Sequence, residues 1–481
     1  MLRNSKSNYL KSIVPLLTAS IMCLTVFWLW LRFEIARHGA SQLHFAGIDQ
    51  SKGDTLIRQI LTGTLILSPT LLLIIYSRSK LLTKYIIRQI ILPFTYSLGG
   101  FIAIWLVIDL SDNGPDLAKA GAPMLGIAKY YLVQIPQILV TILPITLLLS
   151  ILYALGKLSK NNEIISMISS GLSLNKILNP IFFIGLYCSL ISLTLNYEWA
   201  PEAEAHKETV LMSFDKADTQ SQNKQYKLNS RLYRNREGYR TWFIGAMPPN
   251  LASAKLRNVE IYQSDKNGKL IQSYYSNQAK WNYSDNSWTL VKGTIIRFNK
   301  NSEEITQRKF QSLVMTDWNE TPWKIYSGNL APEELGIPGL SFHLKSNSEK
   351  PAKSLAAFKT HWHYRWALPL SCLVITLIAS PLGIVSSKQN LTNSATAAMI
   401  IFFLMLLLTN LFLALAQGMK IPAPLGAWST NLIIGFIGIM LIISRRNNSK
   451  ISIFSITNYL RNGYGKLFHN QQKQTSSRFS S

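Results

Sequence analysis

Charged residues are scarce in this chain of 481 residues, and acidic residues are the scarcer kind. Asp, Glu, Lys and Arg together make up 15% of it, whereas soluble domains average about 25%. The composition therefore argues against an ordinary soluble domain. Because 49 Lys and Arg stand against 24 Asp and Glu, the formal net charge is +25, and the placement of that charge needs an explanation.

Cysteine is also rare. The three cysteines, Cys23, Cys188 and Cys372, all lie inside long apolar stretches. Thiols in such surroundings usually behave as small buried residues. The sequence therefore predicts no disulfide framework and gives no sign of redox chemistry.

Motifs of the common nucleotide-binding and hydrolytic enzymes are missing as well. Three Gly-Lys pairs, which begin at Gly156, Gly268 and Gly465, lack the following Ser or Thr and the upstream glycine of a phosphate-binding loop. GxSxG, HExxH and CxxC do not occur either. We therefore predict a chain that is not an enzyme, with no catalytic residue, cofactor or metal site. An enzyme with another nucleophile and base stays open.

One pair of histidines allows two interpretations. His361 and His363 flank Trp362 just before an apolar run, and two histidines at this spacing could ligate a metal. Amphipathic rings at a membrane boundary more often form an interfacial belt, which is the interpretation we favour.

Long apolar runs are abundant. A helix needs about 20 mostly apolar residues to cross a bilayer. Eight candidate runs lie near residues 13–32, 56–76, 91–108, 132–155, 177–197, 366–385, 395–416 and 425–444. The first run follows basic residues, as the core of a signal peptide does. It is long and lacks a clear small-x-small cleavage site, so we predict a span.

The positive charge is concentrated beside these runs, which indicates a membrane topology rather than a nucleic-acid-binding surface. By the positive-inside rule the basic flanks are cytoplasmic. These flanks contain Arg3, Lys6, Lys11, Arg78, Lys80, Lys84, Arg88, Lys157, Lys160, Arg445, Arg446 and Lys450. Both termini are then expected in the cytoplasm, and the long segment 199–360 outside it.

The segment between the fifth and sixth runs has the pattern of a separate β-domain. From Asn258 to Phe298, aromatic and branched residues alternate with polar ones, as in half-buried strands. Asn267-Gly268 suits a tight hairpin, and Asp285-Asn286 marks the next reversal. We predict a meander that forms part of a β-sandwich or jelly roll.

Aromatic residues on these strands have two possible roles. Tyr262, Trp281 and Trp288 could pack in the core of the domain, as most aromatic residues do. They could instead line an apolar groove for a lipid chain, and the sequence leaves both roles open.

A short polar stretch, LGKLSKNNEIISMISSGLS, lies at 155–173 between the fourth and fifth runs. Ser159 is a candidate N-cap, and Glu163 falls in the first turn, where negative charge suits the helix dipole. Gly171 is placed to end the helix. The apolar positions form one stripe, Ile164, Ile165, Ile168 and Leu172. By itself this pattern also fits a helix that lies on lipid.

Seven segments occur in an order and spacing that are specific to a family. They are LLTKYIIRQIILPF at 81–94, VIDLSDN at 107–113, the polar stretch at 155–173, YEWAPEAEAHKE at 197–208, the strand pattern NVEIY, NGKL, AKW and SWTL within 258–290, RWALPLSCLVITLIASPLG at 365–383 and PAPLGAWSTNLI at 422–433. Over roughly residues 80–445 the chain resembles the LptF/LptG (YjgP/YjgQ) permeases. Those permeases are membrane subunits of the ABC transporter that extracts lipopolysaccharide from the bacterial inner membrane.

The resemblance implies a membrane α-helical bundle with six core spans and an inserted periplasmic β-jelly-roll domain. Here two extra N-terminal spans precede the core. The expected domains are an accessory N-terminal transmembrane hairpin at 1–78, a first transmembrane half at 79–198 with a coupling helix at 159–171, the jelly roll at 199–360, a second transmembrane half at 361–446 and a basic cytoplasmic tail at 447–481.

The resemblance also implies partners. They are an LptB-like ABC ATPase that hydrolyses ATP, a second LptF/LptG-type permease or a second copy of this chain, LptC/LptA-like periplasmic bridge proteins and lipopolysaccharide, with no nucleic acid. In the family, a cytoplasmic helix between the second and third core spans docks in a groove of the ATPase. The residues in that position here are Ser159, Glu163, Ile164, Met167, Ile168 and Gly171.

Charged residues lie at the exported mouth of the first core span. These are Asp109, Asp112, Asp116 and Lys119. They could contact lipid phosphates, or they could be solvated loop charges with no ligand.

The extra N-terminal hairpin contains few polar residues with which to build a pathway. We expect it to pack beside the first core span as an accessory brace. Two rival functions stay open for the whole chain: a membrane-anchored scaffold or sensor that transports nothing, and a permease of the same fold that moves another lipid.

Overall fold

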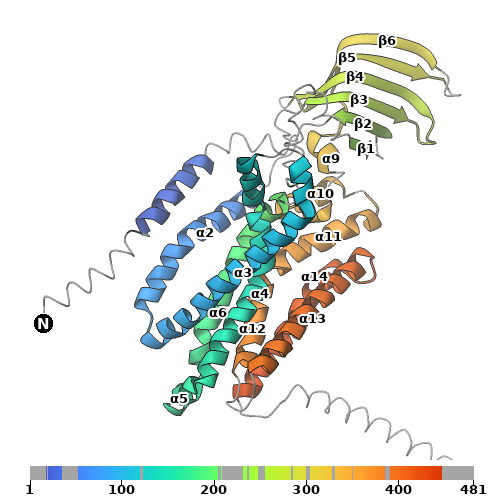
Figure 1. The fold of residues 1–481 in the computed structure, drawn as a ribbon. Helices are drawn as coiled ribbons and strands as arrows, with labels where there is room; N and C mark the ends of the chain where they lie inside the picture. Colours follow the sequence, from blue (N-terminus) through green and yellow to red (C-terminus); the bar gives the residue numbers. More distant parts are fainter. Residues whose placement is uncertain are drawn as a thin grey trace, which may run out of the picture.

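A computed structural model gives the architecture of the chain, a helical body joined at one end to a twisted β-sheet (Figure 1). It describes residues 18, 20–34, 52–119, 123–203, 207, 231–235, 238–246, 255–282, 285–299, 304–327, 331–348, 350–384 and 391–446. The predicted basic tail at 447–481 lies outside the described residues. We call the end of the helical body next to the sheet the sheet end, and the opposite end, which carries α5, the α5 end.

Among the described residues, six helices are long and apolar enough to cross a membrane on their own. Each coincides with one of the apolar runs predicted from the sequence. They are α2 (Lys52–Arg78), α3 (Leu81–Lys119), α4 (Met124–Lys160), α6 (Leu174–Thr194), α13 (Leu391–Gln417) and α14 (Ala423–Arg446). The chain is therefore a membrane helical protein with a sheet domain.

The predicted run at 366–385 has a different form. Its helix, α12 (Leu370–Gly383), has only 14 residues, and α11 (Ala352–Ala367) precedes it at an angle of 51°. Pro369 explains the bend, because proline lacks the N–H that would continue the helical hydrogen bonds. The backbone oxygen of Arg365, four residues earlier, instead accepts a hydrogen bond from Asn196 Nδ2 at 2.7 Å.

Helix α4 is the centre of the helical body and packs against α3, α6 and α12. In its most apolar 18-residue window 72% of the residues are buried, compared with 6% in the window of α3. Close packing against α12 is possible because Gly383 faces Leu155, where a Cβ on the glycine would lie 2.8 Å from the Cβ of Leu155. The main core of the molecule therefore surrounds α4.

The accessory hairpin packs in a different place from the one predicted. Residues 20–34 are helical, and Phe27 and Trp30 contact α2 at Gly63. Helix α2 lies against α6, where the hydroxyls of Ser68 and Tyr187 are 3.1 Å apart. The expectation that the hairpin packs beside the first core span, α3, is therefore wrong. A buried ion pair, described below, explains why α2 is held on α6.

The sheet is a six-stranded antiparallel meander in which the strands are neighbours in sequence order. The strands are β1 (Arg231–Asn235), β2 (Arg240–Ala246), β3 (Lys255–Ser264), β4 (Leu270–Asn282), β5 (Ser287–Phe298) and β6 (Glu304–Met315). Gly268 (φ 81°) lies in the turn between β3 and β4, and Asn286 (φ 47°) in the turn between β4 and β5. The predicted meander and both predicted turns are confirmed. The jelly roll is not confirmed, because a jelly roll has two sheets and the described strands form one.

The two faces of the sheet differ. The closed face carries a core that includes Trp242, Ile261, Tyr274, Trp288 and Leu290. This core is completed by Trp318, by Trp323 and Ile325 of α9 (Pro322–Ser327), by Leu335 after η3 (Pro332–Glu334) and by Leu340 of α10 (Ile337–Ser346). The open face carries Phe243, Tyr262 and Tyr275, whose rings meet edge to face in sequence across β2, β3 and β4.

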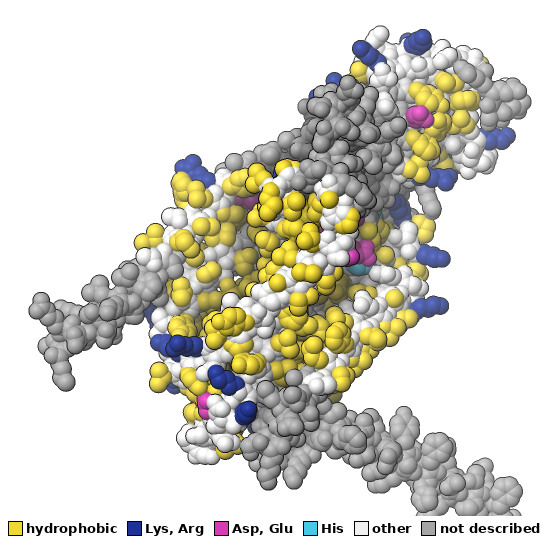
Figure 2. Space-filling view, viewed as in Figure 1, with side chains coloured by type: hydrophobic (Ala, Val, Ile, Leu, Met, Phe, Trp, Pro, Cys, Tyr) yellow, Lys and Arg dark blue, Asp and Glu magenta, His cyan; other side chains and the backbone are white. Residues whose placement is uncertain are grey.

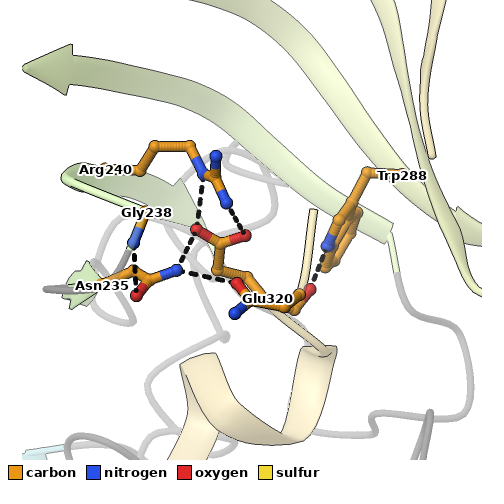
Figure 3. Close-up of polar contacts among 6 residues, drawn as sticks. Asn235, Gly238, Arg240, Trp288 and Glu320 are labelled. Atoms are coloured by element: carbon orange, nitrogen blue, oxygen red, sulfur yellow. Dashed lines mark hydrogen bonds and ion pairs between the residues drawn. The ribbon is translucent and has the colours of Figure 1, made fainter. Parts of the chain in front are cut away.

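A buried polar cluster fixes the connection from β6 to α9 against the sheet (Figure 3). The carboxylate of Glu320, which has no exposed surface, accepts hydrogen bonds from Arg240 Nε (2.7 Å) and Nη2 (3.0 Å) and from Asn235 Nδ2 (2.8 Å). Trp288 Nε1 donates to the backbone oxygen of Glu320. The Arg240 guanidinium also lies over the ring of Trp318, at 5.2 Å from its centroid. The sheet and the return to the helices are thus held by one ion pair that is fully bonded, as a buried charge requires.

Candidate functional site

Helix α5 (Glu163–Ser169) lies where α4 ends and the chain turns back toward the sheet end. The N-cap predicted at Ser159 is wrong, because Ser159 is buried in the last turn of α4 and the residue before α5 is Asn162. Nothing in LGKLSK breaks a helix, so α4 continues through Lys160. The turn falls at the following asparagines, and Asn162 has φ 58°, a conformation that Asn tolerates better than most residues.

The end of α5 is the one predicted from Gly171. Gly171 has φ 88°, its N–H donates to the backbone oxygen of Ile168 at 3.0 Å, and the N–H of Leu172 donates to Met167 at 3.2 Å. This pair of hydrogen bonds is a Schellman motif, which satisfies carbonyls that a helix end leaves open. Helix α5 is therefore a single short helix with a defined end on each side.

The apolar residues of α5 divide into two groups, whereas the sequence predicted one stripe. Ile164 is 2% exposed and joins the main core, and Met167 packs against the same core. Ile165 and Ile168 are 51% and 46% exposed. One group attaches α5 to the helical body, and the other presents apolar surface outward.

Glu163 ties α5 to α3. Its Oε2 accepts a hydrogen bond from the hydroxyl of Tyr85 at 2.6 Å, and its Oε1 accepts one from Asn161 Nδ2 at 3.2 Å. The first bond connects α5 with α3, and the second connects α5 with Asn161 at the end of α4. Glu163 therefore fixes the orientation of α5 relative to both helices. The sequence placed Glu163 in the first turn but gave no signal for Tyr85.

Basic side chains surround this end of the molecule. Arg78, Lys80, Lys157 and Lys160 are all exposed. Figure 2 shows Lys and Arg atoms gathered near the α5 end of the viewed face, beyond a broad apolar surface that covers the helical body. An apolar helix face framed by cations is suited to bind a partner with an apolar groove and acidic rim.

The predicted cluster at the mouth of α3 is only partly a group of free charges. Asp109 is 6% exposed and pairs with Lys207 Nζ at 3.3 Å, and it accepts a hydrogen bond from Asn113 Nδ2 at 2.9 Å. Asp112 is exposed. Asp116 and Lys119 belong to the last turns of α3, but their side chains lie outside the described part of the chain.

The three predicted groove aromatics lie on different faces of the sheet. Trp281 and Trp288 are 6% and 0% exposed and pack against each other on the closed face, with ring centroids 5.2 Å apart. Tyr262 lies on the open face, where its hydroxyl bonds Glu260 Oε2 at 3.0 Å and lies 3.1 Å from the hydroxyl of Tyr275. The hydrogen bond with Tyr275, then burial and the bond to Glu260, raise the pKa of Tyr262 above its usual value.

The histidines before α12 do not form a metal centre in the part of the chain that the structure describes. No group of three or more His, Cys, Asp or Glu side chains there could hold an ion. His361 Nε2 lies 3.0 Å from Glu333 Oε1 and 2.8 Å from Gln417 Nε2, so its ring links α11, η3 and α13.

Four buried charged side chains between the helices, Glu34, Arg58, Glu198 and Arg365, were missed by the sequence analysis. Arg58 on α2 pairs with Glu34 and lies 3.5 Å from Glu198, which belongs to the π-helical turn η1 (Leu195–Trp199) that extends α6. Arg365 is 6% exposed, and its Nη1 donates to Asn196 Oδ1, also in η1, at 2.8 Å. Arg58, Glu198 and Arg365 lie at the edges of apolar runs, and this position was the only signal in the sequence. A charge at the edge of an apolar run is usually interpreted as solvated, so these residues were not expected to be buried.

With this architecture known, comparison with other proteins identifies the family. The chain matches the family model described as lipopolysaccharide export system permease LptF/LptG over residues 84–444, which begins in α3 and ends in α14. It is also similar to the lipopolysaccharide export system permease protein LptG of Haemophilus influenzae, with 23% identity over 373 residues that cover 76% of this chain and 99% of that relative. Because the family model covers well over half of the sequence, the chain belongs to the LptF/LptG family of lipopolysaccharide export system permeases.

Proposed function

We propose that this chain is the non-catalytic permease subunit of an ABC transporter that extracts lipopolysaccharide from the inner membrane. In this proposal a separate LptB-like ATPase hydrolyses ATP, and the sheet domain passes the lipid toward the outer membrane. The observation that carries the proposal is the arrangement of the family core, with a rigidly mounted short helix at one end and an aromatic sheet at the other.

The orientation follows from charge. The α5 end carries exposed Arg78, Lys80, Lys157 and Lys160, and by the positive-inside rule this end faces the cytoplasm. Both termini are then cytoplasmic, and the sheet domain lies in the periplasm.

Helix α5 is proposed as the coupling helix. Its exposed Ile165 and Ile168 would enter an apolar groove of the ATPase, while Ile164 and Met167 remain in the core of the permease. Because Glu163 also bonds Tyr85, a displacement of α5 would be transmitted to α3 as well as to α4. Nucleotide-driven closure of the ATPase would thereby move the lipid-facing helices.

Helix α3 offers the surface for a second permease. Its spanning window is 6% buried within this chain, and Ile104, Val107 and Ile108 are exposed. We propose that a second LptF/LptG-type chain, or a second copy of this one, faces this surface across a cavity that lipid enters from the side. At its periplasmic mouth, Asp109 would orient Lys207 toward lipid phosphates, beside Asp112, Asp116 and Lys119.

The sheet domain is proposed as the conduit to LptC/LptA-like bridge proteins, with its described strands forming part of a jelly roll. Lipid chains would follow the open face, where Phe243, Tyr262 and Tyr275 provide aromatic surface. Strands β1 and β6 end the sheet order, and an edge strand can pair with a strand of another protein.

Co-purification tests the coupling assignment and separates it from a scaffold or sensor, which needs no ATPase. We expect Glu163→Lys to reduce recovery of the ATPase at least tenfold, because it removes the bond to Tyr85 and adds a cation to a basic surface. Asp112→Lys is the matched control, since it makes the same charge change at an exposed site at the other end of α3. Equal recovery with both variants, each inserted normally, would refute the role of α5.

A further inference from the structure

A cavity of about 420 Å³ lies within the helical body near the sheet end, between α4, α11, α12, α13 and α14. Its volume falls in the range of about 300–1,000 Å³ that is usual for small-molecule sites. Thr141 on α4 and Leu406 on α13 line it and are both exposed, so part of its lining reaches the outer surface of the helical body.

The cavity is amphipathic along the direction of the helices. Its apolar walls include Val140, Pro144, Phe402 and Met405. Its polar end, next to the sheet domain, is formed by Arg365, His361 and Glu333. This is the polarity of a lipid molecule whose headgroup lies at the membrane boundary and whose chain enters the apolar interior.

Arg365 is the cation of this site, and its bonds leave its charge without a direct anionic partner. Nη1 donates to the amide oxygen of Asn196 and Nη2 to the backbone oxygen of Glu333, and both acceptors are neutral. The Glu333 carboxylate instead pairs with His361 at 3.0 Å. Among the described residues, Nε of Arg365 has no hydrogen-bond partner.

A second buried donor points the same way. Thr430 on α14 lines the cavity, is 2% exposed, and its hydroxyl lacks a partner within the described ranges. A guanidinium buried without a counter-anion is costly, and an ionisable group within the membrane region is usually functional. An anionic oxygen in the cavity would supply the missing acceptor.

We propose that this cavity binds one anionic phospholipid, with its phosphate at Arg365 and one acyl chain between α4 and α13. Arg binds phosphate well because its planar N–H groups match the phosphate oxygens. The inference goes beyond the proposed function, because the lateral cavity for lipopolysaccharide would lie between two permeases, whereas this site lies among the helices of one chain. The bound lipid would contact the α11–α12 bend, α4, α13 and α14, all of which line the cavity.

The site can be tested by lipid-induced thermal stabilisation of the full chain in a non-ionic detergent, followed by tryptophan fluorescence. Phosphatidylglycerol is the anionic probe, phosphatidylcholine the zwitterionic one, and inorganic phosphate tests whether an anion alone suffices. We expect phosphatidylglycerol to raise the melting temperature at concentrations at least tenfold lower than phosphatidylcholine, and phosphate to have no effect.

Two variants locate the site. Arg365→Gln should raise the half-saturating phosphatidylglycerol concentration at least tenfold. Thr409→Trp, which fills the cavity from α13 without changing Arg365, should do the same and covers the case in which the first variant does not fold. The matched control is Leu407→Trp, on the exposed side of α13, where Leu407 is 62% exposed.

The outcomes decide the proposal. Loss of the phosphatidylglycerol effect in the cavity variants, with the control unchanged, supports it. Two results mean that lipid binds only around the outside of the helices, and either one overturns the proposal. One is that phosphatidylglycerol and phosphatidylcholine raise the melting temperature equally. The other is that phosphatidylglycerol stabilises the cavity variants, the control and the parent chain equally. Stabilisation by inorganic phosphate as strong as that by phosphatidylglycerol also overturns it, because the site would then be an anion site without an acyl chain.

Discussion

Helices α3 and α4 are consecutive, nearly equal in length and both strongly apolar, yet their surroundings are opposite. They have 39 and 37 residues, and the spanning windows are 6% buried in α3 and 72% buried in α4. Most of the apolar surface of α4 is buried against other helices of the same chain. Apolar surface on α3 is left for lipid or for a partner, and large exposed apolar surfaces usually mark such a site.

The sheet repeats this contrast between a closed and an open surface. On the closed face Glu320 is fully buried and bonded to Arg240, whereas on the open face Glu260 is exposed and bonded to Tyr262. In both parts of the molecule, one surface maintains the fold and the other is available for function. The same substitution should therefore change the stability of the chain more on a closed surface than on an open one.

The largest expected effect is on the closed face of the sheet. Glu320→Gln leaves the buried Arg240 guanidinium without its counter-charge, which costs about 3–5 kcal/mol when such a pair is broken. Glu260→Gln, the same change on the open face, should cost less than about 1 kcal/mol. Unfolding monitored by the fluorescence of the Trp242–Trp288–Trp318 cluster would measure both. Similar midpoints for the two variants would mean that the Glu320 cluster does not hold the sheet to the helices.

A pair of glycines makes the corresponding comparison in the helical body. Gly383→Ala would place a Cβ 2.8 Å from the Cβ of Leu155 on α4, and we expect a cost of about 1–3 kcal/mol from overpacking. Gly100→Ala on α3 meets nothing within 4 Å and should stabilise the isolated chain by about 0.5–1 kcal/mol through helix propensity. Thermal unfolding in detergent should therefore shift in opposite directions. A shift in the same direction would contradict the assignment of α3 as open and α4 as closed.

The smallest effect concerns pH and His343, which is buried on α10 and stacked on Phe358 with ring centroids 3.9 Å apart. Burial, and secondarily the charge of Lys350, lowers the pKa of His343 from 6.5 to about 4. As pH falls from 6.5 to about 4, His343 binds a proton in the unfolded chain but not in the folded chain. The stability that the folded chain has above pH 6.5 is therefore lost over this range. His343→Leu should remove about 1 kcal/mol of the loss seen between about pH 7 and about pH 5.5. A variant whose stability falls with pH as steeply as that of the parent chain would show that another group is responsible.

Much of the architecture could be predicted because its signals are local. Apolar runs gave the helices, Asn267-Gly268 gave a hairpin turn, and Gly171 gave the end of α5. The start of α5 was misplaced by a few residues because Ser159 looks like an N-cap on its own. Nothing in that stretch shows that α4 continues through it.

The relations between distant segments could not be predicted in the same way. Arg58 pairs with Glu198 across 140 positions, and Arg365 bonds Asn196 across 169. Each charge looked like the solvated edge of an apolar run. The burial of α4 and the exposure of α3 could not be predicted either. The two helices have similarly apolar sequences, and such sequences give no indication of which helix is surrounded by others.

The most direct test of the central claim, ATP-driven passage of lipopolysaccharide along the open face, is photo-crosslinking at position 262. A photoreactive residue replaces Tyr262 in the full chain, assembled with the ATPase and the second permease in membrane vesicles that contain lipopolysaccharide. We predict lipopolysaccharide adducts when ATP is hydrolysed and none without ATP, with the closed-face position Trp288 unlabelled in both cases. Equal labelling at position 262 with and without ATP would contradict the account.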